Sequence, residues 1–127
     1  MRKRSFKFII EKTKTGYSCF EESKPIYSSG KSIHELQLNS LEAVNLFLDG
    51  SGQSVKMNNL EFEIDYKQFF DFYKVINSKY LAARIGMNES LLSQYITGKK
   101  KPSKKQVNRI AEGLNEIGKE LIELSLV

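Results

Sequence analysis

Residues 78–97 hold two short amphipathic runs separated by one glycine, and this spacing constrains the fold more than any other part of the sequence. Ala82 is small where two helices would touch. Gly86 follows four residues later, where a residue without a Cβ tolerates the positive φ of a tight turn. Met87 and Leu92 are apolar where the second helix would pack back on the first. The pattern therefore predicts two short helices that cross at a tight turn.

A polar face is expected on the second of these helices. Asn88 is a suitable N-cap, because its side-chain oxygen can accept hydrogen bonds from the first unpaired amides of a helix. The polar positions between the apolar ones are Glu89, Ser90, Ser93, Gln94 and Thr97. Polar side chains of these types contact base edges or phosphates, and a recognition helix exposes them near its N-terminal end.

The chain has 127 residues and a net charge of +5, and the excess is confined to its second half. Residues 1–66 hold nine Lys and Arg against nine Asp and Glu, whereas residues 67–127 hold eleven against six. Such an asymmetry suggests that the second half faces a nucleic acid or a membrane surface. Five lysines come directly after the polar helix: Lys99, Lys100, Lys101, Lys104 and Lys105. If all five contacted DNA phosphates, the log–log salt dependence of binding would have a slope of about −4 to −5.

One family of DNA-binding proteins, the phage-repressor (Xre/Cro) type, has a helix-turn-helix domain that resembles the segment LAARIGMNESLLSQYITGKKKPSKKQVNRIAEGL. The matching positions are Leu81-Ala82, Gly86, Ser93, Gly98, Pro102 and Ile110-Ala111. The resemblance covers about residues 66–125, where the spacing of apolar residues by itself predicts four or five short helices. Gly118 is expected to interrupt the last of them.

This resemblance also implies a role for each polar group. The second helix would enter the major groove of operator DNA and contact bases through Asn88, Glu89, Ser90, Ser93 and Gln94, with Thr97 on the same outward face. Phosphate contacts would come from Ser78, Lys79, Lys99, Lys100, Lys101, Lys104 and Lys105. A single small module buries little surface, so we expect a dimer that contacts two half-sites about 34 Å apart.

Period-two alternation predicts a small sheet in the first half of the chain, as in Phe6, Phe8 and Ile10. Turn signals separate the alternating runs, and a capping box, Ser32-x-x-Glu35, opens one helix. The expected elements are strands at 5–12, 17–22, 26–28 and 60–65 and a helix at 33–48. This β-β-β-α-β order buries one face of each element, so we predict a sheet covered by one helix.

The same half of the chain is similar to the HicB antitoxin fold, a reduced RNase H-like β-β-β-α-β domain. The similarity runs through FKFIIEKTKTGYSCFEES and SGKSIHELQLNSLEAVNLFL and agrees best at Gly30, Ser32 and Glu35. In that family a C-terminal DNA-binding domain comes next in the chain. The resemblance implies that the first half binds a small basic protein, the mRNA-cleaving HicA toxin, and that the chain represses its own operon.

The residue types present leave little room for catalysis. The single cysteine, Cys19, and the single histidine, His34, exclude a disulfide framework and most metal sites. We therefore expect no cofactor, no metal and no enzymatic activity. A minimal nuclease that uses Glu61, Glu63 or Asp65 stays open as an alternative, although a solvated strand face also explains these carboxylates.

Two further features bear on the location of the protein. The apolar runs, such as residues 8–10, are far shorter than the roughly 20 residues that span a bilayer. The basic start, residues 1–4, is not followed by the apolar stretch of a secretory signal. We therefore expect a cytoplasmic protein with no membrane partner.

Together these patterns predict an α+β chain with a partner-binding or dimerisation domain at 1–65 and an all-α helix-turn-helix domain at 66–127. Besides the nuclease, two functions remain open. The first is an antitoxin that is also an autorepressor and forms a homodimer or a higher homo-oligomer. The second is a stand-alone regulator whose first domain only dimerises or senses a ligand.

Overall fold

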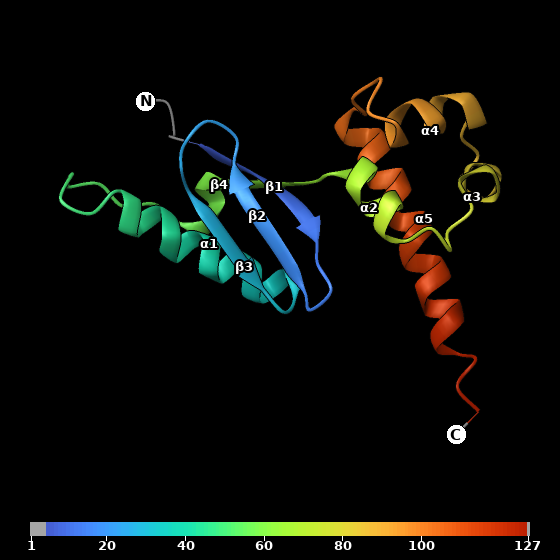
Figure 1. Cartoon of the computed structure of the whole chain (residues 1–127), viewed down its shortest axis with the longest axis horizontal. Helices are drawn as coiled ribbons and strands as arrows, with labels where there is room; N and C mark the ends of the chain where they lie inside the picture. The colour runs from blue at the N-terminus through green and yellow to red at the C-terminus, as the bar shows by residue number, and fades with distance from the viewer. Residues whose placement is uncertain (1–4, 127) are drawn as a thin grey trace. The chain divides into compact units, whose positions relative to one another are not determined.

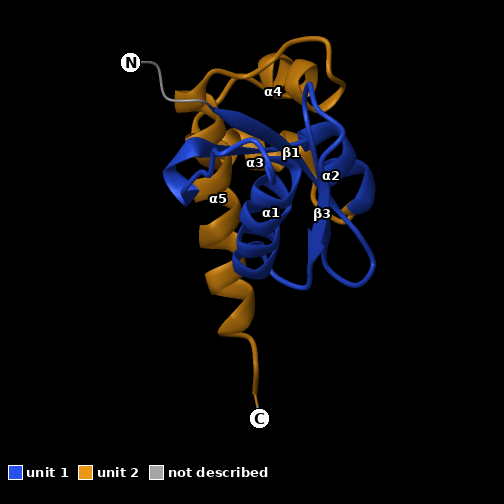
Figure 2. Ribbon diagram, turned by 90° about the vertical axis from the view of Figure 1, so that its left-hand side faces the viewer, with its two compact units in different colours: residues 1–72 blue, residues 73–127 orange. Residues whose placement is uncertain are grey.

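The computed structural model describes residues 5–126, which form two compact units that divide after Phe72 (Figure 1 and Figure 2). The strands lie in the first unit, and the second unit is built from helices. The predicted α+β class is therefore confirmed. The basic start of the chain, residues 1–4, lies outside the described residues. No helix within residues 5–126 is both long and apolar enough to cross a membrane.

The first unit is a four-stranded sheet with one long helix. Its elements are β1 (Phe6–Lys12), β2 (Tyr17–Glu21), β3 (Tyr27–Gly30), α1 (Ile33–Phe47), the 3-10 turn η1 (Met57–Asn59), β4 (Leu60–Ile64) and α2 (Tyr66–Phe72). The strand order is β3-β2-β1-β4, with β4 parallel to β1 and the other pairs antiparallel. The expected β-β-β-α-β order is confirmed, and the parallel pairing of β4 requires the long crossover that α1 supplies.

The core of the first unit lies between α1 and one face of the sheet (Figure 1). Phe6 and Phe8 of β1 point to this face and are fully buried, because alternate side chains of a strand share a face. Leu36 and Val44 of α1 belong to the same buried cluster. Burial of each large apolar side chain contributes about 1.5–3 kcal/mol, so the alternation in β1 determines which face of the sheet α1 covers.

Local chemistry sets both ends of α1. Ser32 Oγ accepts a hydrogen bond from the backbone N of Glu35 at 3.1 Å, which is one half of the expected capping box. A Cβ on Gly30 would lie 2.4 Å from the backbone N of Leu36, so glycine is required where α1 starts against β3. Gly50, just beyond the helix, has a φ of +82° and lets the chain turn away.

Helix α2 is held by the first unit. The Gln68 side chain donates to the Lys12 carbonyl at 2.7 Å and accepts from the Lys12 backbone N at 2.8 Å. The Lys12 ammonium also lies 5.3 Å from the centre of the Phe72 ring. The sequence placed the domain boundary between residues 65 and 66. The compact units instead divide after Phe72, because these contacts keep α2 on β1.

The second unit contains α3 (Ser78–Ile85), α4 (Glu89–Ile96) and α5 (Lys104–Ile122). Leu81, Leu92 and Ile110, one from each helix, are almost fully buried in its core. The expected interruption at Gly118 is wrong, since α5 continues through this residue to Ile122. One glycine weakens a helix by only about 1 kcal/mol relative to alanine, and the good helix formers around it outweigh that loss.

Candidate nucleic-acid interface

The turn between α3 and α4 has the geometry that the sequence predicts. Gly86 caps α3 with a φ of +68°, in the left-handed region. Asn88 caps α4, since its Oδ1 accepts hydrogen bonds from the backbone N of Ser90 at 2.8 Å and of Leu91 at 3.2 Å. Met87, between the two caps, is buried. The predicted glycine turn and the predicted Asn88 cap are both confirmed, and together they set the direction in which α4 leaves the turn.

Arg109 of α5, which was not predicted from the sequence, stabilises this turn. The Arg109 guanidinium donates to the carbonyl oxygens of Ile85 at 2.8 Å and of Gly86 at 2.9 Å. Its other terminal nitrogen donates to Gln106 Oε1 at 3.0 Å. Carbonyl groups at the end of a helix lack partners inside it, so Arg109 satisfies two groups that the turn leaves unpaired. In sequence, Arg109 looks like one more phosphate contact in a basic region.

Helix α4 presents the predicted polar face to solvent. Leu92 and Tyr95 form its buried side. The exposed residues are Glu89, Ser90, Ser93, Gln94 and Thr97. These positions share one side of the helix because residues four apart lie one above the other. The structure thus brings the predicted base-contacting residues together on one surface.

Two of those candidates already use their side chains within the domain. Asn88 Oδ1 accepts the two capping hydrogen bonds, and Thr97 Oγ1 donates to the Ser93 carbonyl at 2.9 Å. Thr97 also lies at the C-terminal end of α4, whereas recognition helices contact bases through their N-terminal residues. The first two turns of α4 therefore offer the best base-contacting positions, with Gln94 as the long amide side chain among them.

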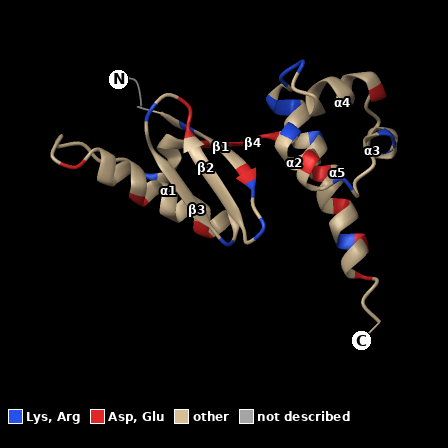
Figure 3. Cartoon of the chain, viewed as in Figure 1, with Lys and Arg blue, Asp and Glu red and all other residues tan. Residues whose placement is uncertain are grey.

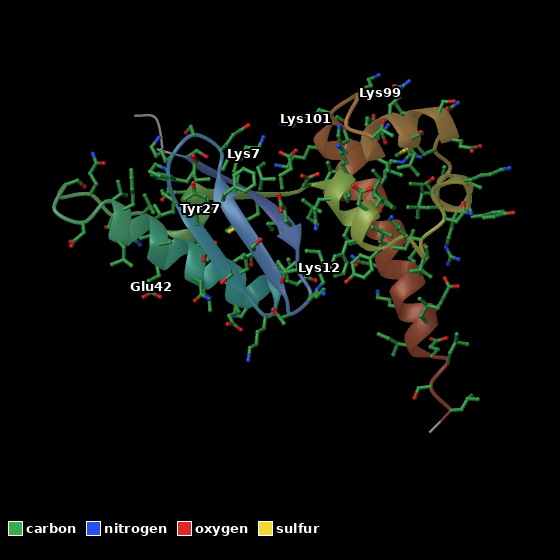
Figure 4. All side chains as sticks on the ribbon, viewed as in Figure 1. Lys7, Lys12, Tyr27, Glu42, Lys99 and Lys101 are labelled. Atoms are coloured by element: carbon green, nitrogen blue, oxygen red, sulfur yellow. The ribbon has the colours of Figure 1, made fainter. Side chains whose placement is uncertain are left out.

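Five exposed lysines, which we call the basic strip, come after α4: Lys99, Lys100, Lys101, Lys104 and Lys105. Figure 3 shows this concentration of positive charge between α4 and α5, and Figure 4 labels Lys99 and Lys101 within it. The loop folds back on α4, because the Lys100 backbone N donates to the Gln94 carbonyl at 3.2 Å. The strip therefore adjoins the end of α4, as phosphate contact requires.

The last two lysines of the strip occupy an unusual place. Lys104 and Lys105 stand in the first turn of α5, behind the N-cap Ser103, and this turn holds no acidic residue. A helix N-terminus carries partial positive charge, so a cation there is unfavourable by about 0.3–1 kcal/mol. An anion at this end would meet unpaired amides and two ammonium groups. The charges of Lys104 and Lys105 therefore do not stabilise α5, but they would attract a polyanion at this end of the helix.

Ser78 and Lys79, the other two predicted phosphate-contacting residues, are the first residues of α3. Lys79 is exposed, and Ser78 is half-buried. Sequence reasoning passed over Asn77, the N-cap of α3, whose Oδ1 accepts from the backbone N of Lys79 at 3.0 Å and of Tyr80 at 3.3 Å. An asparagine directly before an amphipathic run is the ordinary signal for such a cap, and it was available in the sequence.

The carboxylates that would serve a nuclease do not gather. Glu61 and Glu63 lie on β4, but Asp65 lies just past the end of the strand and caps α2 by accepting from the backbone N of Gln68 at 3.1 Å. The Glu63 carboxylate is paired with the Lys7 ammonium at 2.8 Å. Within residues 5–126, no group of three or more His, Cys, Asp or Glu side chains could hold a metal ion.

Two buried titratable groups support the fold of the first unit. Burial raises the pKa of the Cys19 thiol, which lies 3.2 Å from Ser40 Oγ. Burial also acts to raise the pKa of the Glu21 carboxyl, but hydrogen bonds outweigh it and hold that pKa below its usual range. The donors include the backbone N of Ser23 at 2.6 Å and of Lys7 at 3.2 Å.

The geometry of the second unit defines a class of domain: two helices joined by a glycine turn, with an exposed polar second helix beside a basic strip, form a DNA-binding helix-turn-helix. Comparison with known families agrees, since residues 76–120 match the model of a helix-turn-helix family. The predicted helix-turn-helix domain is confirmed, and the chain carries the domain of a DNA-binding transcription regulator. No curated protein and no solved structure matches the chain.

Proposed function

We propose that the chain is a sequence-specific repressor that occupies its operator through α4 and the basic strip. The observation that carries this proposal is the exposed polar face of α4 directly beside five lysines, two of which are unfavourable for their own helix. Side chains on α4 would supply base contacts, and the lysines would position the domain on the phosphate backbone. Bound in this way, the chain blocks transcription of its own operon.

In this proposal the chain is also the antitoxin of a HicA–HicB-type module. Its first unit binds and neutralises the toxin, a small basic protein that cleaves mRNA. A shallow groove of about 460 Å³ on α1 supports this role. Its lining joins apolar side chains to two carboxylates, and consists of Leu38, Leu41, Glu42, Asn45, Leu46 and Asp49. Figure 4 labels Glu42 on this helix. The last turn of α1 holds no basic residue, so its negative end also favours a cationic partner.

Neither role requires catalysis, so the proposal assigns the chain no enzymatic activity. It also places the protein in the cytoplasm, where an operator and a newly made toxin are both accessible. The ion pair between Glu63 and Lys7 argues against a metal ligand at this position. Magnesium-dependent nucleic-acid cleavage that disappears in the Glu63→Gln variant would overturn this assignment.

Fluorescence anisotropy with duplex DNA from upstream of the gene tests operator binding. Gln94→Ala should weaken binding to the operator by about 1–3 kcal/mol and relax its specificity. Lys100→Ala should weaken binding to every duplex alike and reduce the salt slope by about 1. Lys31→Ala, at an exposed lysine of the first unit, is the matched control and should change neither. Unchanged operator affinity in Gln94→Ala would mean that another face of α4 contacts the bases.

A pull-down of the tagged chain from its native host, with mass spectrometry, tests the partner. A small basic protein recovered in stoichiometric amount, and released by Glu42→Lys in the α1 groove, supports the antitoxin. Recovery of the folded, DNA-competent chain alone instead favours a stand-alone regulator whose first unit dimerises or senses a ligand.

A further inference from the structure

The acidic residues of the second unit lie apart from its basic strip, with one exception. Residues 73–127 contain five acidic residues, and four of them lie in the later part of α5 or just past its end: Glu112, Glu116, Glu120 and Glu123. The basic strip ends in the first turn of the same helix. The exception is Glu89, the first residue of α4 and a member of its exposed polar face. One carboxylate is therefore present on the helix that the proposed function places in the major groove.

Glu89 has no partner in its own unit. Its side chain is exposed, and within residues 5–126 its carboxylate forms neither an ion pair nor a hydrogen bond. By contrast, Glu120 of α5 pairs with Arg84 of α3. Phosphates repel a carboxylate, and attraction to phosphates supplies most of the general affinity of a protein for DNA. Glu89 therefore opposes DNA binding unless it makes a favourable contact of its own.

Stabilisation of the helix does not by itself explain this residue. An acidic side chain in the first turn of a helix is favourable, because the N-terminus carries partial positive charge. The other two helices of the unit do not use this effect, since the first turns of α3 and α5 hold no acidic residue. Both of those turns contain lysine instead, Lys79 in α3 and Lys104 in α5. Of these three helices, the one with an acidic first turn is the one expected to contact bases.

The position of Glu89 is suitable for contact with a base edge. Recognition helices contact bases through their N-terminal residues, and Glu89 directly follows the N-cap Asn88. The exposed residues in the first two turns of α4 are Glu89, Ser90, Ser93 and Gln94. The two serines have short side chains, so Glu89 and Gln94 have the greatest reach into a groove. Glu89 is the one of these two that carries a charge.

We propose that Glu89 determines one base of the operator, a cytosine contacted in the major groove. A carboxylate can only accept hydrogen bonds. In the major groove, guanine presents two acceptors, thymine presents an acceptor, and adenine presents an acceptor beside its donor, whereas cytosine presents only a donor, its N4 amino group. The match of residues 76–120 to a helix-turn-helix family does not determine which bases α4 contacts. The inference rests on the proposed function, because it concerns the operator that α4 would contact.

Repulsion contributes to this choice as much as attraction does. A guanine or a thymine at the same position would bring an acceptor oxygen toward the Glu89 carboxylate, and neither group could donate a hydrogen bond. Specificity can arise from such unfavourable contacts with the wrong partner. Glu89 thus lowers affinity for most sequences and affects the cytosine site least. The five lysines of the basic strip offset the general loss of affinity.

Selection from a library of duplexes with random sequence tests the proposal. The wild-type chain should enrich a site with cytosine at one position, and anisotropy should show a preference of about 5- to 150-fold over the other bases there. Glu89→Gln should change the selected base to adenine, because an amide can bond both N6 and N7 of adenine. The matched control is Glu112→Gln, which removes the same charge from an exposed position of α5 and should leave the selected site unchanged.

Glu89→Ala separates the base contact from an effect on the helix. This variant should accept any base at the cytosine position, and it should bind duplexes without the site more tightly than wild type does, because the repulsion of phosphates is lost. If Glu89 served only the helix, both Glu89 variants would have lower thermal stability and would select the same site as wild type. That result would overturn the proposal.

The same selection separates this failure from failure of the proposed function. If wild type and Glu89→Gln both enrich one and the same site, Glu89 does not determine a base, and the sequence-specific repressor stands. If wild type binds duplex DNA but enriches no site, the sequence-specific repressor is overturned, and the assignment of Glu89 is overturned with it.

Discussion

Helices α1 and α5 are both amphipathic, but their own units use them to different extents. Helix α1 has Glu35 in its first turn, the charge that a helix N-terminus favours, and its apolar side is buried from Leu36 to Val44. Helix α5 has Lys104 and Lys105 in its first turn, and its apolar side is buried only as far as Gly113. Both helices have a serine as their N-cap, so the difference lies in the charges of the first turn and in how far burial extends along each helix.

The difference in first-turn charge and in burial distinguishes residues that stabilise their own unit from residues that are available to bind other molecules. At the N-terminal end of α1, the Ser32 cap, the first-turn Glu35 and the buried Leu36 all lower the free energy of the first unit. Helix α5 keeps two charges that its macrodipole disfavours and a leucine, Leu121, that its core does not cover. Natural sequences depart from local consistency mainly at functional sites, so we expect these positions of α5 to contact other molecules.

The largest effect expected from this comparison concerns one leucine of each helix, buried in α1 and exposed in α5. Leu36→Ala should lower the free energy of unfolding of the first unit by about 2–5 kcal/mol, because it leaves a cavity between α1 and the sheet. Leu121→Ala should change the stability of the second unit, measured in the monomer, by no more than about 0.5 kcal/mol. Urea denaturation followed by circular dichroism measures both. Equal losses in the two variants would show that the C-terminal half of α5 has a covering partner inside its own monomer.

Arg109 provides the next effect, because it is a residue of α5 that the fold does use. Arg109→Ala should destabilise the second unit by about 1.5–3 kcal/mol, since two carbonyl groups lose a charged donor. Arg109→Ala should also weaken DNA binding, because the turn that Arg109 stabilises sets the direction of α4. Arg84→Ala is the control: its ion pair with Glu120 is exposed and should contribute about 0–1 kcal/mol. If both variants behave alike in thermal unfolding, the hydrogen bonds of Arg109 do not stabilise the turn.

The features that sequence analysis predicted correctly depend on neighbours in the chain. The alternation of Phe6 and Phe8 requires only that one face of a strand be buried, and the caps at Ser32 and Asn88 act on amides two or three residues away. The polar face of α4 results from helical spacing alone. These features depend little on the rest of the fold.

The contacts that were not predicted from the sequence join residues far apart in the chain. The domain boundary moves because Gln68 bonds the backbone of Lys12, and the turn is braced because Arg109 reaches Gly86. Neither contact can be read from local spacing, because each exists only after the elements have packed. The interruption predicted at Gly118 is wrong for the opposite reason. An isolated glycine weakens a helix only slightly, and the helix formers around it keep α5 continuous.

The acid response should separate the two units. Hydrogen bonds lower the pKa of Glu21 in the folded first unit, so the stabilisation is fully present above the pKa of an unfolded glutamate, about 4.3, and is lost as pH falls below it. The second unit has no buried carboxylate among its described residues. Glu21→Gln should lower the stability of the first unit at neutral pH by about 1 kcal/mol and flatten its acid dependence. The same acid slope in wild type and variant would assign the acid sensitivity to another group.

The smallest effect tests the comparison most directly, because stability and binding should change in opposite directions. Lys104→Glu places an anion at the positive end of α5, so it should stabilise the second unit by about 0.3–1 kcal/mol. The same change should weaken DNA binding and lower the salt slope by at least about 1, since a phosphate contact becomes a repulsion. Lys119→Glu, in the last turn of α5, is the mirror control: it should slightly destabilise the helix and leave DNA binding nearly unchanged. Thermal unfolding and anisotropy on the same preparations measure both quantities. If Lys104→Glu lowered stability and affinity together, Lys104 would be a structural residue, and the basic strip would lose the evidence that it is maintained for a polyanion.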